Sequence, residues 1–311
     1  DPLLSGDTSV SCASCHHPDL GFTDGRPRCV GIGGGEVNRA APSLWNVAFL
    51  NTFFCDARAI YREEQMQGPL YAANEMGTSP VQLLAEIAAN DTYVRLFRDA
   101  YPGGGDAPTL GQIYTAIAAF QTSLVSLNSR YDQYAHGYHD ALTASEKAGM
   151  NVFRSFVARC AECHTPPLFT NQQVAVIGVR EPDGRAFDPG AETVYENPGL
   201  RGGFKVPSLR NVAQTAPYMH SGTFATLREA AEFYTLGRGH ALPDEEKERV
   251  SVHWHIWEPN LTHDELDRLV DFLGTLSDER FKPHIPAAVP SGLLPIGTLP
   301  ETLTTRMSQS N

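Results

Sequence analysis

The stretch Cys12-Ala13-Ser14-Cys15-His16 recurs in pattern at Cys160-Ala161-Glu162-Cys163-His164, in a chain that has 6 cysteines. In the pattern Cys-x-x-Cys-His, the two thiols form thioether bonds to the vinyl groups of a haem, and the histidine becomes the proximal iron ligand. A zinc site would need a second pair of ligands at a characteristic spacing, and none follows either motif closely. A thioredoxin-like dithiol is the other alternative. The sequence therefore predicts two covalent haem c groups, one held by Cys12, Cys15 and His16 and one by Cys160, Cys163 and His164.

The bulk properties of the chain exclude some classes of protein. It has 311 residues, enough for two domains of ordinary size, and a formal net charge of −12. The negative charge argues against a nucleic-acid partner. No apolar run reaches the length of about 18 residues that a transmembrane helix needs, so we expect no membrane span.

Helix signals dominate the chain, and alternating strand patterns are sparse. Ser79 and Pro80 are typical of an N-cap followed by the first helical residue, and Thr109 precedes an apolar stripe of helical spacing over residues 110–124. In a capping box, a Thr and the Glu three residues later cap each other's backbone N–H groups at the start of a helix. Three such boxes are present, at Thr143 with Glu146, Thr226 with Glu229 and Thr262 with Glu265.

Long stretches rich in Gly and Pro separate these helices, notably residues 25–42 and 165–207. We therefore expect a mainly α fold of two cytochrome c-like domains, each with one covalent c-type haem and long irregular loops. The boundary falls near Ala141, which gives domains of residues 1–141 and 142–311. The Pro-rich tail from Lys282 is counted with the second domain and is expected to lie extended over the surface.

The cellular compartment follows from the haem motifs. The chain begins at Asp1 with no initiator Met and no signal-peptide pattern, and we interpret it as a mature or trimmed product. Haem attachment to Cys-x-x-Cys-His occurs outside the bacterial cytoplasm, so the periplasm is the expected location. In that oxidising compartment the two remaining thiols, Cys29 and Cys55, could form a disulfide or could each be a small buried side chain.

The residues around both motifs resemble one family, the bacterial dihaem cytochrome c peroxidase/MauG superfamily, over nearly the whole chain. The resemblance is carried, in order, by the segments 11–16, 21–25, 41–46, 56–58, 64–65, 68–70 and 75–77, and then by 159–164, 206–212 and 216–222. Ordinary members reduce hydrogen peroxide with electrons from small donor proteins. MauG-like members, including the kynurenine-forming MbnH type, use peroxide to oxidise a tryptophan of a partner protein at long range.

The position of the distal ligand of the second haem separates these two kinds. It is Met in ordinary peroxidases and Tyr in MauG-like enzymes, and it falls on Tyr234 here. A tyrosinate would lower the haem potential, whereas Met would raise it. Tyr234 could instead be a buried aromatic of an amphipathic helix. Met219 is the other nearby donor, but relatives do not use it as a ligand.

The resemblance also implies a peroxide-reactive first haem. A His that caps this haem in ordinary peroxidases aligns with Ile32, which cannot bind iron, so the site is expected to be open in the ferric state. Gln65 and Glu75 align with the distal Gln and Glu of the family. Glu75 is the candidate acid–base group for O–O cleavage, and Gln65 would orient the peroxide by hydrogen bonds. Both could otherwise be solvated polar residues.

Three further expectations concern the inter-haem route, a surface relay and calcium. Most relatives place a Trp between the haems where this chain has Cys55, which leaves the coupling route open. Trp254 and Trp257 are candidate relay residues to the surface, or ordinary packing aromatics. Relatives bind Ca²⁺ between the domains, and Thr215 and Pro217 match its carbonyl ligands. The Asn that binds Ca²⁺ in relatives aligns near Ala40, so this ligand is expected to be lost, although Asn38 is close in the sequence.

Together these features predict a periplasmic MauG-like enzyme. Hydrogen peroxide would produce a high-valent, bis-ferryl state that oxidises a residue of a periplasmic partner protein, with Trp as the expected target. The first alternative is a dihaem peroxidase that reduces peroxide with electrons from a small periplasmic donor. The second is a dihaem electron-transfer cytochrome, which would require both haems to be six-coordinate.

Overall fold

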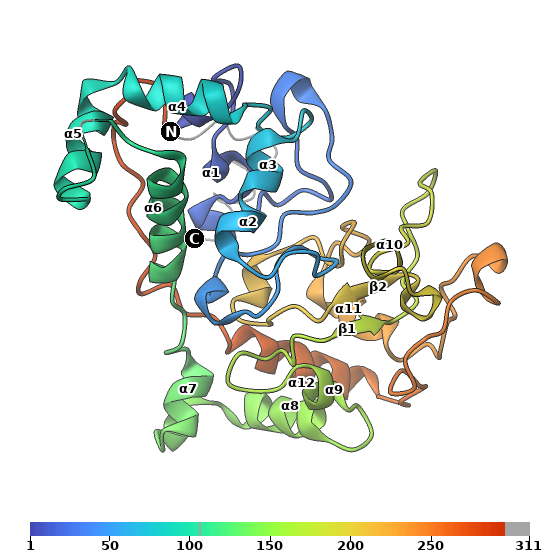
Figure 1. The fold of residues 1–311 in the computed structure, drawn as a ribbon. Helices are drawn as coiled ribbons and strands as arrows, with labels where there is room; N and C mark the ends of the chain where they lie inside the picture. The colour runs from blue at the N-terminus through green and yellow to red at the C-terminus, as the bar shows by residue number, and fades with distance from the viewer. Residues whose placement is uncertain (106, 296–311) are drawn as a thin grey trace. The chain divides into compact units, whose positions relative to one another are not determined.

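The computed structural model of the chain describes residues 1–105 and 107–295 (Figure 1). The fold is mainly helical with few strands, as the sequence predicts. The chain packs as two compact units. The N-terminal unit contains Asp1–Leu44, Tyr61–Leu124 and residues 282–295, and the C-terminal unit contains Trp45–Ile60 and Val125–Phe281.

The N-terminal unit is built from helices that surround one apolar core. The helices are α1 Cys12–Cys15, α2 Arg62–Gln65, α3 Gln67–Tyr71, α4 Pro80–Ala88, α5 Asp91–Ala100 and α6 Leu110–Ser123. The two predicted starts are confirmed, because the Ser79 side chain accepts from the Gln82 backbone N–H and Thr109 forms a capping box with Gln112. Leu83, Ile87 and Ile113 are buried at the centre of this core.

The C-terminal unit holds the remaining helices and a two-stranded sheet. The helices are α7 Arg130–Ala135, α8 Ala144–Arg154, α9 Cys160–Cys163, α10 Glu192–Tyr195, α11 Leu227–Phe233 and α12 His263–Gly274. The strands β1 Val174–Val176 and β2 Gly203–Lys205 pair antiparallel, with Ala175 opposite Phe204. The three predicted capping boxes are present at the starts of α8, α11 and α12.

Short 3₁₀ helices interrupt the loops of both units. They are η1 Pro2–Leu4, η2 Pro18–Leu20, η3 Ile32–Gly34, η4 Val47–Phe49, η5 His139–Ala141, η6 Pro198–Leu200, η7 Val212–Gln214 and η8 Asp244–Glu246. Among the residues that the structure describes, no helix combines the length and apolar character needed to cross a membrane.

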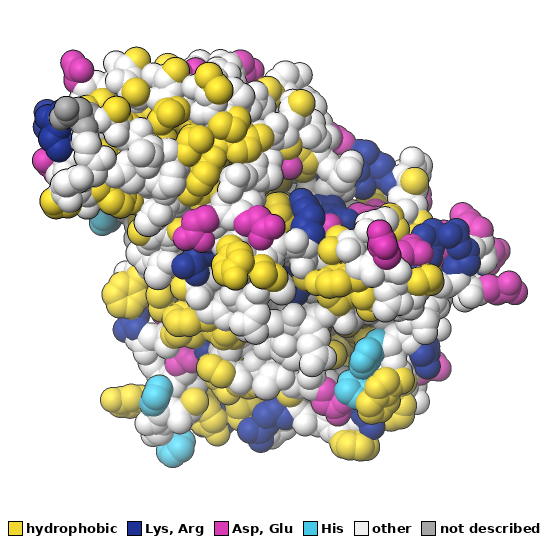
Figure 2. All heavy atoms as spheres, viewed as in Figure 1, with side chains coloured by type: hydrophobic (Ala, Val, Ile, Leu, Met, Phe, Trp, Pro, Cys, Tyr) yellow, Lys and Arg dark blue, Asp and Glu magenta, His cyan; other side chains and the backbone are white. Residues whose placement is uncertain are grey.

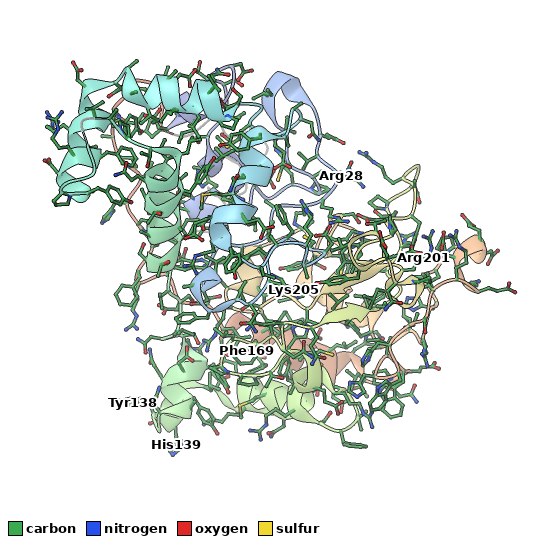
Figure 3. The ribbon with its side chains drawn as sticks, viewed as in Figure 1. Arg28, Tyr138, His139, Phe169, Arg201 and Lys205 are labelled. Atoms are coloured by element: carbon green, nitrogen blue, oxygen red, sulfur yellow. The ribbon has the colours of Figure 1, made fainter. Side chains whose placement is uncertain are left out.

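Phe169 is central to the core of the C-terminal unit (Figure 3). Its ring meets Tyr131 edge-on at a centroid distance of 4.9 Å and lies 5.8 Å from the ring of Phe153. Helices α8 and α12 close this core, and they approach so tightly at Gly149 that a Cβ there would overlap the Arg268 carbonyl. The absence of a side chain therefore sets the spacing of the two helices.

A buried ion pair fixes α7 to the loop that follows the second haem motif. The guanidinium of Arg210 donates to both carboxylate oxygens of Asp132 at 2.6 and 2.7 Å and also to the Pro167 carbonyl. Arg210 is fully buried, so the paired charges and their hydrogen bonds must compensate for lost hydration.

The packing units differ from the two continuous halves that the sequence suggests. Residues 125–141 pack with the C-terminal unit because Tyr131 and Asp132 make the contacts just described. Residues 45–60 also belong there, since the Lys205 backbone N–H donates to the Cys55 carbonyl at 2.7 Å. Residues 282–295 of the tail belong to the N-terminal unit, where Lys282 pairs with Asp19 at 2.9 Å. The tail beyond residue 295 lies outside the described residues.

Candidate haem sites

The first haem motif forms a single helical turn whose histidine is held by a backbone carbonyl. Nδ1 of His16 lies 3.0 Å from the Phe22 carbonyl oxygen, in the loop that directly follows α1. This contact fixes the tautomer and leaves Nε2 as the nitrogen for an iron. Burial lowers the pKa of His16 and favours the neutral imidazole that metal ligation requires.

The second motif repeats this arrangement in the C-terminal unit. Nδ1 of His164 lies 3.1 Å from the Phe169 carbonyl oxygen and 3.2 Å from that of Pro207. Burial lowers the pKa of His164 and raises the pKa of the Cys160 thiol to about 12. Both histidines therefore present Nε2 and both turns carry two thiols, so the residues present fit covalent haem at each site.

The Gly-rich loop of the N-terminal unit packs directly on the turn that carries Glu75. The Ile32 backbone N–H donates to the Glu75 carbonyl at 2.9 Å, and the Ile32 side chain fills the space beside Gly77. Gly31 approaches so closely that a Cβ would overlap the Asn74 carbonyl. The structure thus brings together Ile32 and Glu75, the residues predicted to leave the first haem open and to assist peroxide cleavage.

Gln65 is the last residue of α2 and is half-buried. Helix α3 connects it to the Glu75 turn, which is tied to α3 by a hydrogen bond of 3.0 Å from the Met76 backbone N–H to the Pro69 carbonyl. Gln65 and Glu75 therefore belong to one locally braced segment of the N-terminal unit.

Tyr234 follows the last residue of α11, and its half-buried side chain lies near the second haem motif. Burial raises its pKa well above the usual range, and the nearby thiols of Cys160 and Cys163 add to the increase. The ligand candidate and the attachment cysteines therefore lie together within the C-terminal unit. Met219, the alternative donor, lies in a turn closed by the bridge between Tyr218 and Phe224.

Trp254 and Trp257 lie on the surface, 65% and 44% exposed, and are not part of a buried core. The indole of Trp257 donates to the Val157 carbonyl at 3.0 Å, and the Arg159 guanidinium lies over both indole rings. Histidine side chains adjoin hydrophobic ones in this part of the C-terminal unit, at the lower right of Figure 2. Because Arg159 directly precedes Cys160, the two indoles are anchored beside the second haem motif.

The two cysteines outside the motifs are not joined to each other. Cys29 and Cys55 are free thiols and belong to different packing units. Cys29 instead lies beside Cys15 and Asp24. The sequence contains Asp24 within the family segment 21–25, but nothing in the spacing of these residues indicates that Cys29 joins them.

Sequence reasoning also missed a buried pair in the C-terminal unit. Nε2 of His220 lies 2.6 Å from Glu181, the His220 ring stacks on Phe204 at 3.9 Å, and Asp188 lies close by. Of the proposed calcium ligands, Thr215 directly follows η7 and its hydroxyl donates to the Val212 carbonyl at 3.1 Å, and Pro217 follows two residues later.

Comparison with known proteins identifies relatives that are dihaem peroxidases or MauG proteins. A sequence profile described as di-haem cytochrome c peroxidase matches residues 1–140. The chain is 34% identical over 299 residues to the methylamine utilization protein MauG of Methylorubrum extorquens, covering 95% of this chain and 78% of that protein. It is 31% identical over 292 residues to the cytochrome c551 peroxidase of Nitrosomonas europaea, covering 94% and 81%.

Solved structures show the same relationship. A MauG-like protein associated with microbial copper homeostasis superposes with a TM-score of 0.82 at 32% identity, covering 91% of this chain and 88% of that one. The diheme peroxidase BthA of Burkholderia thailandensis gives 0.78 at 27% identity, covering 96% and 88%. The chain therefore belongs to the di-haem cytochrome c peroxidase family that includes MauG. It is a haem-dependent oxidoreductase that acts with peroxide.

Proposed function

We propose that the chain is a MauG-like enzyme that uses hydrogen peroxide to oxidise a residue of a partner protein, with tryptophan as the target. The observation that carries this proposal is that the half-buried Tyr234 lies near Cys160 and Cys163. By the family resemblance, this is the position where ordinary members have Met. An anionic oxygen ligand stabilises oxidised iron and lowers its reduction potential. The second haem would therefore hold an oxidising equivalent and would accept electrons poorly from a donor protein.

The side chains near the first haem would control the protons of peroxide. When bound by Cys12, Cys15 and His16 and by Cys160, Cys163 and His164, the two haems would supply the redox chemistry. Glu75 would accept one proton of hydrogen peroxide and return it to the leaving oxygen, which departs as water. Gln65 would orient the peroxide by hydrogen bonds, and Ile32, which has no atom that could bind iron, would leave the first haem accessible to peroxide.

The oxidising equivalents would leave the C-terminal unit through the surface near the second motif. Trp254 and Trp257 are our candidates for this relay because they are exposed and anchored beside Cys160 through Arg159. The inter-haem route would run through or past Cys55. The expected partner is a periplasmic protein, and Thr215 and Pro217 would provide carbonyl ligands to one Ca²⁺.

The alternative is peroxide reduction with electrons from a small periplasmic donor. It is favoured by a similarity to cytochrome c551 peroxidases that is nearly as high as the similarity to MauG. Rapid peroxide reduction with a reduced small cytochrome would support it. A dihaem electron-transfer cytochrome, the second alternative, predicts a purely low-spin ferric spectrum.

Replacing Tyr234 tests the ligand on which the proposal depends. We expect Tyr234→Met to raise the reduction potential of one haem and to restore peroxide reduction by a cytochrome donor. Tyr234→Phe, the matched control, should lose the tyrosinate signature without gaining a sulfur ligand. Absorption, EPR and potentiometry would follow both variants. Haem spectra and potentials unchanged in Tyr234→Met would exclude Tyr234 as a ligand and remove the main support for the proposal.

A further inference from the structure

A buried thiol and carboxylate adjoin the first haem motif in the N-terminal unit. Cys29 is 5% exposed and Asp24 is 3% exposed. The sulfurs of Cys15 and Cys29 and a carboxylate oxygen of Asp24 all lie within 4.8 Å of one another. Cys29 follows Arg28, which Figure 3 labels on the loop of the N-terminal unit.

Asp24 has one oxygen that the local structure does not satisfy. Its Oδ1 accepts the Arg26 backbone N–H at 3.1 Å. Its Oδ2 is buried and has no hydrogen-bond partner among the described residues. An unpaired buried carboxylate oxygen is costly, and it is also a ready acceptor for a proton released nearby.

The position of Cys15 gives this cluster a redox context. The Cys15 sulfur is the atom expected to carry a thioether bond to the first haem, so Cys29 lies within 4.8 Å of an atom joined covalently to that group. This bond also removes Cys15 as a thiolate ligand, which argues against a metal ion held by the three residues. A thiol is among the most readily oxidised side chains, and its oxidation releases a proton.

We propose that Cys29 and Asp24 form an internal proton-coupled electron donor to the peroxide-oxidised first haem. The inference rests on the proposed function, because it needs the oxidising equivalents that peroxide provides. In the step, the S–H bond of Cys29 breaks, one electron passes to the oxidised haem centre, and the proton passes to Asp24. The products are a Cys29 sulfur radical, a neutral Asp24 carboxyl and a haem centre reduced by one electron.

A second one-electron oxidation would complete the reaction when no partner protein is present. The Cys29 sulfur radical loses another electron and gains the oxygen of water, which yields a sulfenic acid and releases a proton. Summed with peroxide reduction, one thiol and one hydrogen peroxide give one sulfenic acid and one water. Cys29 would thus compete with the partner for the oxidising equivalents and would be modified when the partner is absent.

The test is peroxide treatment of the diferric holoprotein without a partner. Absorption would follow the lifetime of the high-valent state, and peptide mass spectrometry after trapping of sulfenic acids would follow Cys29. We expect Cys29 to gain one oxygen atom in the wild type. We expect Cys29→Ser to lengthen the lifetime several-fold and Asp24→Asn to slow the oxidation of Cys29. Tyr101→Phe is the matched control, because this half-buried phenol of the same unit donates only to the Gln112 carbonyl in the described hydrogen bonds.

The outcomes separate this inference from the proposed function. A high-valent state that forms but decays equally fast in Cys29→Ser, with Cys29 still a thiol in the wild type, overturns the inference alone. Equal Cys29 oxidation in Glu75→Gln would mean that peroxide attacks the thiol directly, which also overturns it. If no high-valent state forms in any variant, the proposed function fails and the inference fails with it.

Discussion

At the scale of single residues, the two haem motifs share a contact that orients the histidine ring. His16 and His164 each place Nδ1 near a backbone carbonyl of the loop that follows, so the sequence after each motif orients the ring before iron binds. The motifs themselves could be predicted from the sequence because their chemistry is local. The carbonyl partners could not, since they depend on the path of irregular loops.

Glu75→Gln is expected to lower peroxide turnover by about 10²-fold or more, because the amide cannot accept and return a proton. Stopped-flow absorption of the holoprotein with hydrogen peroxide would measure the rate. Glu64→Gln, a change at an exposed carboxylate on α2, is the matched control and should react at the wild-type rate. Full activity of Glu75→Gln would exclude it as the acid–base group.

The spatial neighbours of Cys29 could not be predicted from the sequence. The sequence left a disulfide with Cys55 open, but the fold places Cys29 against Cys15 and Asp24 in the N-terminal unit. The two cysteines of this cluster are separated by turns, Gly residues and Pro27, whose combined path has no periodicity that a sequence pattern could report.

At the scale of secondary structure, the helix starts were predictable because capping is local. All three Thr…Glu capping boxes and the starts of α4 and α6 are confirmed. Their signals lie within four residues, so no tertiary information is needed. The spacing between packed helices, by contrast, depends on residues such as Gly149 whose role appears only when the partner helix is in place.

Replacement by alanine at two glycines should therefore change the stability of the protein in opposite directions. Gly149→Ala is expected to destabilise the protein, because the new Cβ overlaps the Arg268 carbonyl of α12. Gly111→Ala on α6 meets no atom within 4 Å and should stabilise the protein by up to about 1 kcal/mol through helix propensity. Urea unfolding of the holoprotein would measure both. The same sign for both variants would contradict the packing assigned to Gly149.

The buried pair that fixes α7 gives a prediction for stability. Asp132→Asn leaves the guanidinium of Arg210 buried without a counter-charge, and we expect a loss of about 3–5 kcal/mol in the free energy of unfolding. Asp267→Asn, which breaks an exposed pair with Arg228, should cost less than about 1 kcal/mol. Similar losses in the two variants would show that Arg210 does not depend on its ion pair.

The same pair has a defined pH dependence. Burial raises the pKa of Asp132, but the hydrogen bonds and charge of Arg210 outweigh burial, so the pKa lies below its usual value. A lowered folded-state pKa stabilises the protein above the unfolded value of about 3.9, and this contribution is lost as pH falls through the folded-state pKa. The difference between wild type and Asp132→Asn should therefore shrink in acid. A difference that grows as pH falls below 4 would contradict this sign.

At the scale of the whole molecule, the family and its two haem motifs could be predicted, but the packing units could not. The motifs and the segments between them give the class of protein, which the comparisons with MauG and the peroxidases confirm. The packing units do not follow a single boundary near residue 141, because residues 45–60 and 125–141 join the C-terminal unit and residues 282–295 join the N-terminal unit. These exchanges depend on long-range contacts such as Tyr131 on Phe169, which no local pattern encodes.

The most direct test of the proposed function is the reaction of the as-isolated diferric protein with stoichiometric hydrogen peroxide and no electron donor. Near-infrared absorption and Mössbauer spectroscopy would follow both irons. A MauG-like enzyme with Tyr234 as ligand and Ile32 beside an open first site is expected to form a long-lived state in which both irons are oxidised beyond ferric. Absence of any reaction until the second haem is reduced would contradict this account and would place the chain with the ordinary peroxidases.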